Sequence, residues 1–469
     1  MMGERALSRR RALQASLAVG AGAAAAARAS APAAADEEAG HARPDGSYAR
    51  NTELVGFTDM DRRPALKMAV REVAGRWYLY TGHQQHGGWS IVDVTDPARP
   101  RMVRFIKGPA HTLTLQMDLH GDTMVTALEK IFPEEADPDP GAPYEEGVLI
   151  WDIADPVRPR RLGHFRTGGT GTHRNLYPGG RYVHLAAGMP GHQGNIYVIL
   201  DIADRSRPRE AGRWWVPGQR EDEAALRDGD TAWRPGHPAG CCAAPASVSL
   251  HGPPYPTRDG LVYLPYGGAG LIVLDISDVS RPRPVGRLSF SPPFHDHLGV
   301  HGVLPVPERG IAFANSENIT YGEGPAHHAS IVDISDPRKP YLLSLFPEPV
   351  PPPGAPYEDF TTRGGWRGPH NINHHQHHPA VRRQDGLFYI AHFNAGLRIY
   401  DVSNKRLPRE VGFYMPPDPK ERLGMLPVGD LVLQTDDVVV DRRGFIYISH
   451  KNDGVYIVRY TGPVPKEDR

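Results

Sequence analysis

The chain has 469 residues, and its 53 basic and 54 acidic side chains leave a formal net charge of −1. Nothing in this balance points to a nucleic acid or an anionic membrane surface, so we expect no nucleic-acid partner and no membrane anchor. Glycine (51 residues) and proline (47 residues) are frequent, which is typical of a chain with many turns between short strands.

The first 35 residues are expected to be an export signal that is not part of the fold. The segment SRRRALQ (residues 8–14) has a twin-arginine pattern, a short Ala-rich run follows it, and Ala33-Ala34-Ala35 offers a cleavage site. The run is short and weakly apolar, which suits an export signal better than a membrane anchor. We therefore expect export by the twin-arginine machinery and a soluble protein in the periplasm. The alternative, an Ala-rich disordered tail, explains the composition but not the order of these features.

Residues 36–50 are expected to form a linker, and a strand signature recurs through the chain after it. In each copy a short run of β-branched and aliphatic residues ends at an Asp, and a turn with Asp-Pro or its equivalent follows. The Asp side chain can accept hydrogen bonds from backbone amides of the turn. The copies are residues 90–100, 149–159, 198–208, 272–282, 330–340 and 398–408, with a decayed seventh copy at 455–463.

Regular self-similarity of units made only of strands predicts an all-β fold, a β-propeller. Seven copies predict seven blades in one domain over residues 51–463, followed by a tail at 464–469. The segment ELVGF (residues 53–57) is similar to the strand that follows the other signatures, for example RLGHF (161–165), whereas no such strand follows the last copy. We therefore expect the N-terminal strand to complete the last blade and close the ring.

The signature resembles the LVIVD-repeat family, whose members are taken to be β-propellers. The resemblance extends from about Leu54 to Tyr460. It implies the architecture but no chemistry, because a fold does not determine a function. The function has to be inferred from residues that differ between the repeats.

Histidines occupy one equivalent position of the expected inner strands in four successive repeats. Alignment from the start of each second strand gives His173, His251, His301 and His375, with Met68, Thr114 and Asp437 in the other repeats. Because inner strands line the axis of a propeller, these four imidazoles predict a metal site. Neutral imidazole suits a transition metal, with Fe or Cu favoured and Mn or Zn also compatible. The alternative is a water-filled channel lined by polar side chains, and His374 competes with His375 for the axial position.

Three further residues are candidates for catalysis: Asp437, His297 and His392. A carboxylate beside a metal-bound imidazole can orient it or act as a base, and Asp437, Asp296 or Glu317 has the required chemistry. For each of the three the alternative is a solvated loop charge, and this is the preferred interpretation for Asp296 and Glu317. His297 precedes His301 by four residues on the same strand face, and His392 ends a second strand. The histidines outside the axis are otherwise expected at the rim.

The sequence leaves three functions open. The first is a metal-dependent oxidoreductase, an oxidase or oxygenase, acting on a small organic substrate, and the second is a metal-dependent lyase at the same site. The third is a non-catalytic propeller that binds a protein or envelope component. In geometry alone, the expected site is similar to that of carotenoid-cleaving dioxygenases and of the methanethiol oxidase and selenium-binding family. Their extended motifs are absent here, as are Cys-x-x-Cys pairs, phosphate-binding Gly-rich loops and a Gly-x-Ser-x-Gly elbow. The adjacent Cys241 and Cys242 are expected in a mouth loop, with no assigned role.

Overall fold

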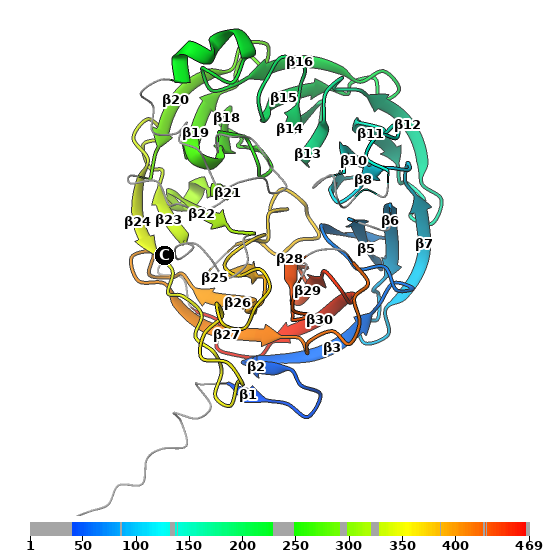
Figure 1. The fold of residues 1–469 in the computed structure, drawn as a ribbon, viewed down its shortest axis with the longest axis vertical. Coiled ribbons are helices and arrows are strands. Elements are labelled where there is room, and N and C mark those ends of the chain that lie inside the picture. Colours follow the sequence, from blue (N-terminus) through cyan, green and yellow to red (C-terminus); the bar gives the residue numbers. More distant parts are fainter. Residues whose placement is uncertain are drawn as a thin grey trace, which may run out of the picture.

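The computed structural model describes residues 40–84, 87–131, 137, 139–227, 248–290, 298–319, 328–384, 386–424, 427 and 429–465. Antiparallel sheets are arranged as a ring around a central axis (Figure 1). The expected all-β propeller is confirmed. The expected export signal lies outside the described residues. Among the described residues, no helix is long and apolar enough to cross a membrane.

The strands follow one another around the ring in chain order. The first sheet contains β4 (Met68–Val73), β5 (Arg76–His83), β6 (Gly88–Asp93) and β7 (Arg101–Lys107). It is followed by β8 (Thr112–Leu113), β9 (Met117–His120), β10 (Thr123–Lys130), β11 (Gly147–Asp152) and β12 (Arg160–Phe165), and then by β13 (Gly171–Leu176), β14 (Tyr182–Gly188), β15 (Asn195–Asp201) and β16 (Arg209–Trp214). The next groups are β17 (Tyr255–Pro256), β18 (Leu261–Pro265), β19 (Leu271–Asp275) and β20 (Arg283–Leu288), and β21 (Leu298–Val306), β22 (Ile311–Glu317), β23 (Ala329–Asp333) and β24 (Tyr341–Leu345). The last are β25 (Leu387–His392), β26 (Gly396–Asp401) and β27 (Arg409–Met415), and β28 (Thr435–Val440), β29 (Phe445–His450) and β30 (Val455–Tyr460).

The number of seven blades stays a prediction. The pair Glu129 and Gly171 joins β10 to β13, so the strands of two expected blades form one continuous sheet. Short 3₁₀ helices occur at Glu221–Arg227, Gly267–Ala269 and Pro307–Arg309.

The N-terminal segment closes the ring, as the sequence predicts. Strand β3 (Thr52–Thr58) pairs antiparallel with β30, from Thr52 opposite Tyr460 to Thr58 opposite Val455. The expected linker differs from the structure, because β1 (His41–Ala42) and β2 (Tyr48–Arg50) lie within it. Strand β2 pairs with β27 and so satisfies an edge that would otherwise expose backbone donors and acceptors. The segment therefore joins two neighbouring sheets.

The repeated signature forms the turns that pack one sheet onto the next. In six of the seven copies the signature Asp accepts a hydrogen bond from the backbone amide two residues later, as from Thr95 to Asp93 and from Ser277 to Asp275. A glycine in the outermost strand of the preceding sheet faces such a turn. A Cβ atom added at Gly286 would overlap the carbonyl oxygen of Pro337. The repeated turn and the repeated glycine therefore fit each other at successive contacts around the ring.

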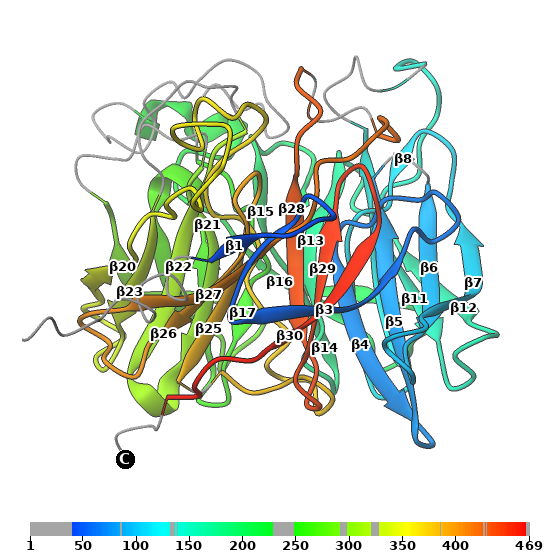
Figure 2. The same cartoon turned by 90° about the horizontal axis from the view of Figure 1, so that it is seen from below.

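The hydrophobic core lies between neighbouring sheets. One cluster, for example, combines Leu387 and Ile399 of β25 and β26 with Val438 and Ile448 of β28 and β29, and all four are fully buried. The centre of the ring holds a different kind of structure. The gold segment between β24 and β25 crosses the centre in Figure 1, and Figure 2 shows yellow parts of the same connection gathered over one face. This crossing segment contributes histidines to the axis.

Candidate metal centre

Four histidines occupy the innermost positions of four successive sheets. His173 lies on β13 and His301 on β21, each within a shift of the strand register. The backbone amide of His251 donates to the carbonyl of Pro265, at the end of β18, and that of His370 donates to Ala391 on β25. A register shift redirects side chains relative to the regular alternation of a strand. The inner edge of each sheet is thus irregular where a histidine faces the axis.

The four imidazoles form a continuous arc of ring contacts. Ring centroids are 4.3 Å apart for His173 and His251, 4.6 Å for His251 and His301, and 4.6 Å for His301 and His370. All four side chains are buried, with 3 % exposure or less. The arc follows the order of the sheets around the ring.

The carboxylate of Glu317 lies among the ring nitrogens of this arc. Its oxygens are 3.7 Å from Nε2 of His251, 3.8 Å from Nε2 of His301 and 3.1 Å from Nε2 of His370. Ligands at about 2.0–2.2 Å from one tetrahedral ion lie about 3.3–3.6 Å from each other. The separations are therefore close to those between neighbouring ligands of a transition-metal ion. Possible His, Asp and Glu metal ligands are present in the structure, and His251, His301 and Glu317 form one such group.

Two of the histidines are oriented through their second ring nitrogen. Nδ1 of His173 lies 2.8 Å from Oε2 of Glu129, and Nδ1 of His370 lies 2.7 Å from the carbonyl oxygen of Asp436. A carboxylate only accepts hydrogen bonds, so Nδ1 of neutral His173 carries the proton and its Nε2 keeps the lone pair that a metal requires, which is the usual arrangement of metal-binding histidines. In His370 the two ring nitrogens face two acceptors, the carbonyl of Asp436 and the carboxylate of Glu317.

The environment also keeps one member of the arc, His301, neutral. Burial lowers the pKa of His301 well below its usual value, although the carboxylate of Glu317 opposes this effect. The charge of a protonated His370 would act in the same direction as burial. A neutral imidazole is the form that binds a metal, so His301 is in its binding form at ordinary pH.

The structure does not bring His375 to the arc, and His370 takes the expected fourth place. His375 donates from Nδ1 to Asp118 at 2.8 Å, and Nε2 of His377 lies 3.4 Å from the same carboxylate. These three residues form a second group of possible metal ligands. The sequence alignment failed here because the chain leaves the sheet after the bridge between Ile372 and Ile390. Counting back from β25 along a regular hairpin therefore reaches the crossing segment instead of the inner edge.

Glu317 is a candidate functional residue. The interpretation of Glu317 as a solvated loop charge is wrong, because the side chain is buried. It ends β22 and has 4 % exposure. The signal was available in the sequence, because Glu317 follows a second strand at the same end of the sheet as the arc. Glu129 lies near the end of β10 and is also buried. Nothing in the local sequence distinguishes it from the glutamates that lie on the surface.

Asp437 is buried in an ion pair at the inner edge of β28. Its Oδ1 accepts from Nζ of Lys67 at 2.7 Å, and its Oδ2 accepts from the backbone amide of Met68 at 2.8 Å. Lys67 and Asp437 have 1 % and 0 % side-chain exposure. The pair joins the last sheet to the first, so these contacts of Asp437 are structural. His297, Asp296, Cys241 and Cys242 lie outside the described residues.

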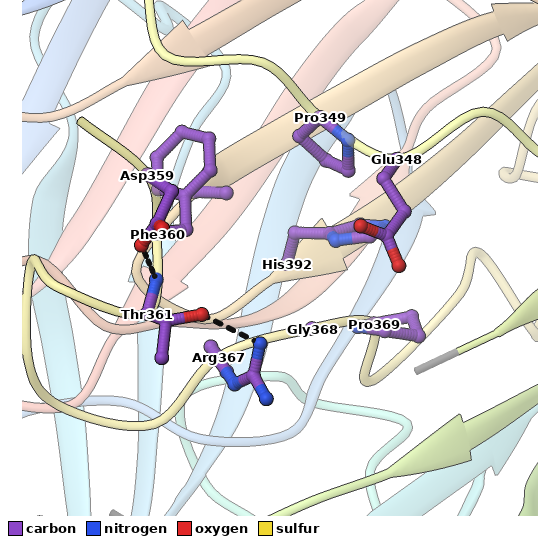
Figure 3. Close-up of a pocket in the computed structure, with 10 residues that line it drawn as sticks. Glu348, Pro349, Asp359, Phe360, Thr361, Arg367, Gly368, Pro369 and His392 are labelled. Atoms are coloured by element: carbon purple, nitrogen blue, oxygen red, sulfur yellow. Dashed lines mark hydrogen bonds between the residues drawn. The ribbon is translucent and has the colours of Figure 1, made fainter. Parts of the chain in front are cut away.

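His392 lines a cavity of about 210 Å³ beside the arc. Figure 3 shows His392 facing Glu348, with Arg367 on the other side of the opening. Nη1 of Arg367 donates to Thr361 at 2.7 Å, and the backbone of Thr361 donates to Asp359 at 2.8 Å. Residues 367–369 of the cavity wall directly precede His370, so the cavity and the arc share one segment of chain.

Two segments of the chain match a family model described as LVIVD repeat, residues 260–289 and 385–416. The chain contains LVIVD repeats. The matches confirm the resemblance seen in the signature, and they contain β18 to β20 and β25 to β27. His251 and His370 precede these LVIVD repeats, so the family model does not include them.

The comparison with curated proteins found no match to this chain. Its structure is similar to that of the periplasmic gluconolactonase PpgL of Pseudomonas aeruginosa, with a TM-score of 0.47 and 11 % sequence identity. The similarity covers 87 % of this chain and 98 % of the other.

Proposed function

We propose that the protein is a metal-dependent enzyme whose ion is held on the propeller axis by His173, His251, His301 and His370. The observation that supports this most strongly is the convergence of Nε2 atoms from different sheets on the carboxylate of Glu317, at 3.1–3.8 Å. A ring of polar side chains in a water-filled channel does not require this convergence, nor does it require Nδ1 of His173 to be held by Glu129.

We propose an oxidoreductase acting on a small organic substrate. Four neutral imidazoles suit Fe or Cu, and Mn and Zn remain compatible with the donor set. Such a metal would supply redox chemistry towards the substrate or molecular oxygen when bound. The protein contributes orientation and the exclusion of water, because the arc is buried and the ring of His370 stacks on Phe393 at 4.6 Å.

A metal-dependent lyase is the second candidate, and the position of Glu317 favours it. Its carboxylate is buried within 3.8 Å of two imidazoles and 3.1 Å from the third. A carboxylate in this position can serve either as a ligand or as a general base that removes a proton from a bound substrate. The oxidoreductase and the lyase therefore differ in the metal that they need and in the role of Glu317.

We infer export to the periplasm by the twin-arginine machinery from residues 1–35. This machinery carries proteins that have already folded, so the metal would enter before export. A periplasmic location detected by fractionation, and lost when Arg9 and Arg10 are replaced by Lys, would test this inference.

Elemental analysis of the protein purified without a histidine tag tests the proposed function. We expect near-stoichiometric Fe or Cu in the native protein and loss of the metal from a His251→Ala/His301→Ala variant. A His184→Ala variant is the matched control, because His184 is buried elsewhere and bonds the hydroxyl of Tyr197. Mn or Zn in the native protein would favour the lyase. Protein that stays metal-free after reconstitution would contradict the proposal and favour a non-catalytic binding propeller.

A further inference from the structure

A buried arginine lies next to the arc. Arg174 follows His173 on β13, within the same register shift, and has 3 % exposure. Its Nη1 donates to Oε1 of Gln116 at 3.1 Å. Among the described residues, no hydrogen-bond partner is found for its Nε and no carboxylate forms an ion pair with it.

Arg174 reaches the axis from its own sheet. After burial and other charges, its positive charge contributes to lowering the pKa of both His301 and His374. His301 belongs to β21 and His374 to the crossing segment, so the guanidinium lies near parts of the chain from other sides of the ring. Its hydrogen bond to Gln116, in the segment between β8 and β9, places the guanidinium at the inner edge where two neighbouring groups of strands meet, one residue after His173.

His374 lies at the same place, and the structure makes room for it. Neither ring nitrogen of His374 has a hydrogen-bond partner within the described part of the chain, although the residue has 1 % exposure. A Cβ atom at Gly302 would lie 3.5 Å from Nε2 of His374 and 2.7 Å from Oδ1 of Asn315. Gly302 follows His301 directly, so this imidazole packs against the backbone next to a member of the arc.

Among the described residues, no carboxylate forms an ion pair with Arg174; against the effect of burial, Lys451 and then Arg174 contribute to lowering the pKa of Asp436, so Asp436 compensates Arg174 only at a distance. Lys67 is paired with Asp437, and Lys451 with Asp436, each at 2.7 Å. Burying an unpaired cation is costly, and buried polar groups nearly always find a partner. A ligand with one negative charge would satisfy the guanidinium and the nearby imidazole together.

We propose that Arg174 and His374 form a subsite for the carboxylate group of the substrate, beside the four-histidine centre. The planar guanidinium matches a carboxylate through two parallel hydrogen bonds, and an imidazole N–H adds a third donor. The inference rests on the proposed function, because it assigns a substrate class, carboxylic acids, to that site. The substrate is held by its carboxylate while its remaining part faces the arc.

Acetate and its uncharged analogue acetamide are the probes that test this subsite. In protein loaded with Cu(II), we expect faster relaxation of the methyl protons of acetate but not of acetamide. Arg174→Gln should weaken acetate binding at least tenfold with unchanged copper content, and Arg174→Lys should restore part of it. Arg71→Gln is the matched control, since Arg71 is a buried arginine of β4 that has its own carboxylate partner, Asp122.

The outcomes separate this subsite from the metal centre. Acetate binding that is unchanged in Arg174→Gln, or equal binding of acetamide or chloride, would overturn the subsite while leaving the metal centre intact. If no metal is bound, the proposed function fails, and the subsite is tested by thermal stabilisation of the metal-free protein. There, stabilisation by acetate that depends on Arg174 would support the subsite, and its absence would overturn it.

Discussion

Nε2 of His370 lies 3.1 Å from Oε1 of Glu317, and this contact connects the inner edge of the sheet of β25 to the end of β22. The two side chains come from neighbouring sheets and are both buried. The same carboxylate approaches His251 and His301 through its other oxygen. Glu317 therefore marks the point on which the arc converges, and it identifies His370 as the fourth member.

His370→Ala is expected to lose most of the bound metal, whereas His375→Ala is expected to keep it. The reason is that His370 contributes its Nε2 to the arc, while His375 is bonded to Asp118. Elemental analysis of both purified variants measures the difference. Since both histidines are buried, circular dichroism serves as the control for folding. The reverse pattern would place the metal in the group of Asp118, His375 and His377.

The architecture was predictable because every repeat carries the same local information. The signature Asp and its turn recur at fixed places, and the glycine that faces the turn recurs in the preceding strand. The pairing of β3 with β30 was predictable from two observations. Residues 53–57 resemble the strand that follows the other signatures, and no such strand follows the last signature. The strands β1 and β2 were not predictable, because they depend on a free edge of β27 that exists only in the folded protein.

The histidine positions were predictable in those sheets whose inner edge keeps the same spacing to the second strand as in the other repeats. His173, His251 and His301 lie where the alignment placed them, since short connections separate them from the next strand. His370 was missed because the crossing segment adds an excursion between the inner edge and β25. The sequence places Glu317 at the end of a second strand, but its contacts with the arc depend on distances across sheets, which no local pattern contains.

Glu129→Gln is expected to weaken metal binding about 10–100-fold. The carboxylate of Glu129 holds Nδ1 of His173 at 2.8 Å and so fixes the orientation in which Nε2 faces the arc. Glutamine can keep a hydrogen bond but loses the negative charge that raises the basicity of the imidazole. Competition with a chelator of known affinity measures the change. Glu145→Gln is the control, because Glu145 pairs with the exposed Arg166; an equal loss in both variants would contradict the role of Glu129.

Asp437→Asn is expected to lower the free energy of unfolding by about 3–5 kcal/mol, because it leaves the buried ammonium of Lys67 without its anion. Urea unfolding measures this change. A Lys67→Met/Asp437→Leu variant should be closer to the wild-type protein, since it removes both charges. If Asp437→Asn keeps its stability and its metal but loses the enzymatic activity, Asp437 acts in catalysis and the structural account of the ion pair is wrong.

Acid is expected to destabilise the fold through buried neutral histidines such as His184. Burial lowers the pKa of His184 to about 3, from an ordinary value of about 6.5. Between these two values the unfolded chain binds a proton that the folded protein does not bind, so the free energy of unfolding decreases as the pH falls below 6.5. From pH 7.5 to 5.5 this single group should lower the free energy of unfolding by about 1.4 kcal/mol.

Urea unfolding at both pH values, with a chelator present to remove proton competition at the metal centre, should show this loss in the wild-type protein. The loss should be about 1.4 kcal/mol smaller in His184→Gln, whose amide can still bond Tyr197 but does not titrate. An identical pH dependence in the two proteins would mean that His184 binds its proton in the folded state, contrary to its burial beside the hydroxyl of Tyr197.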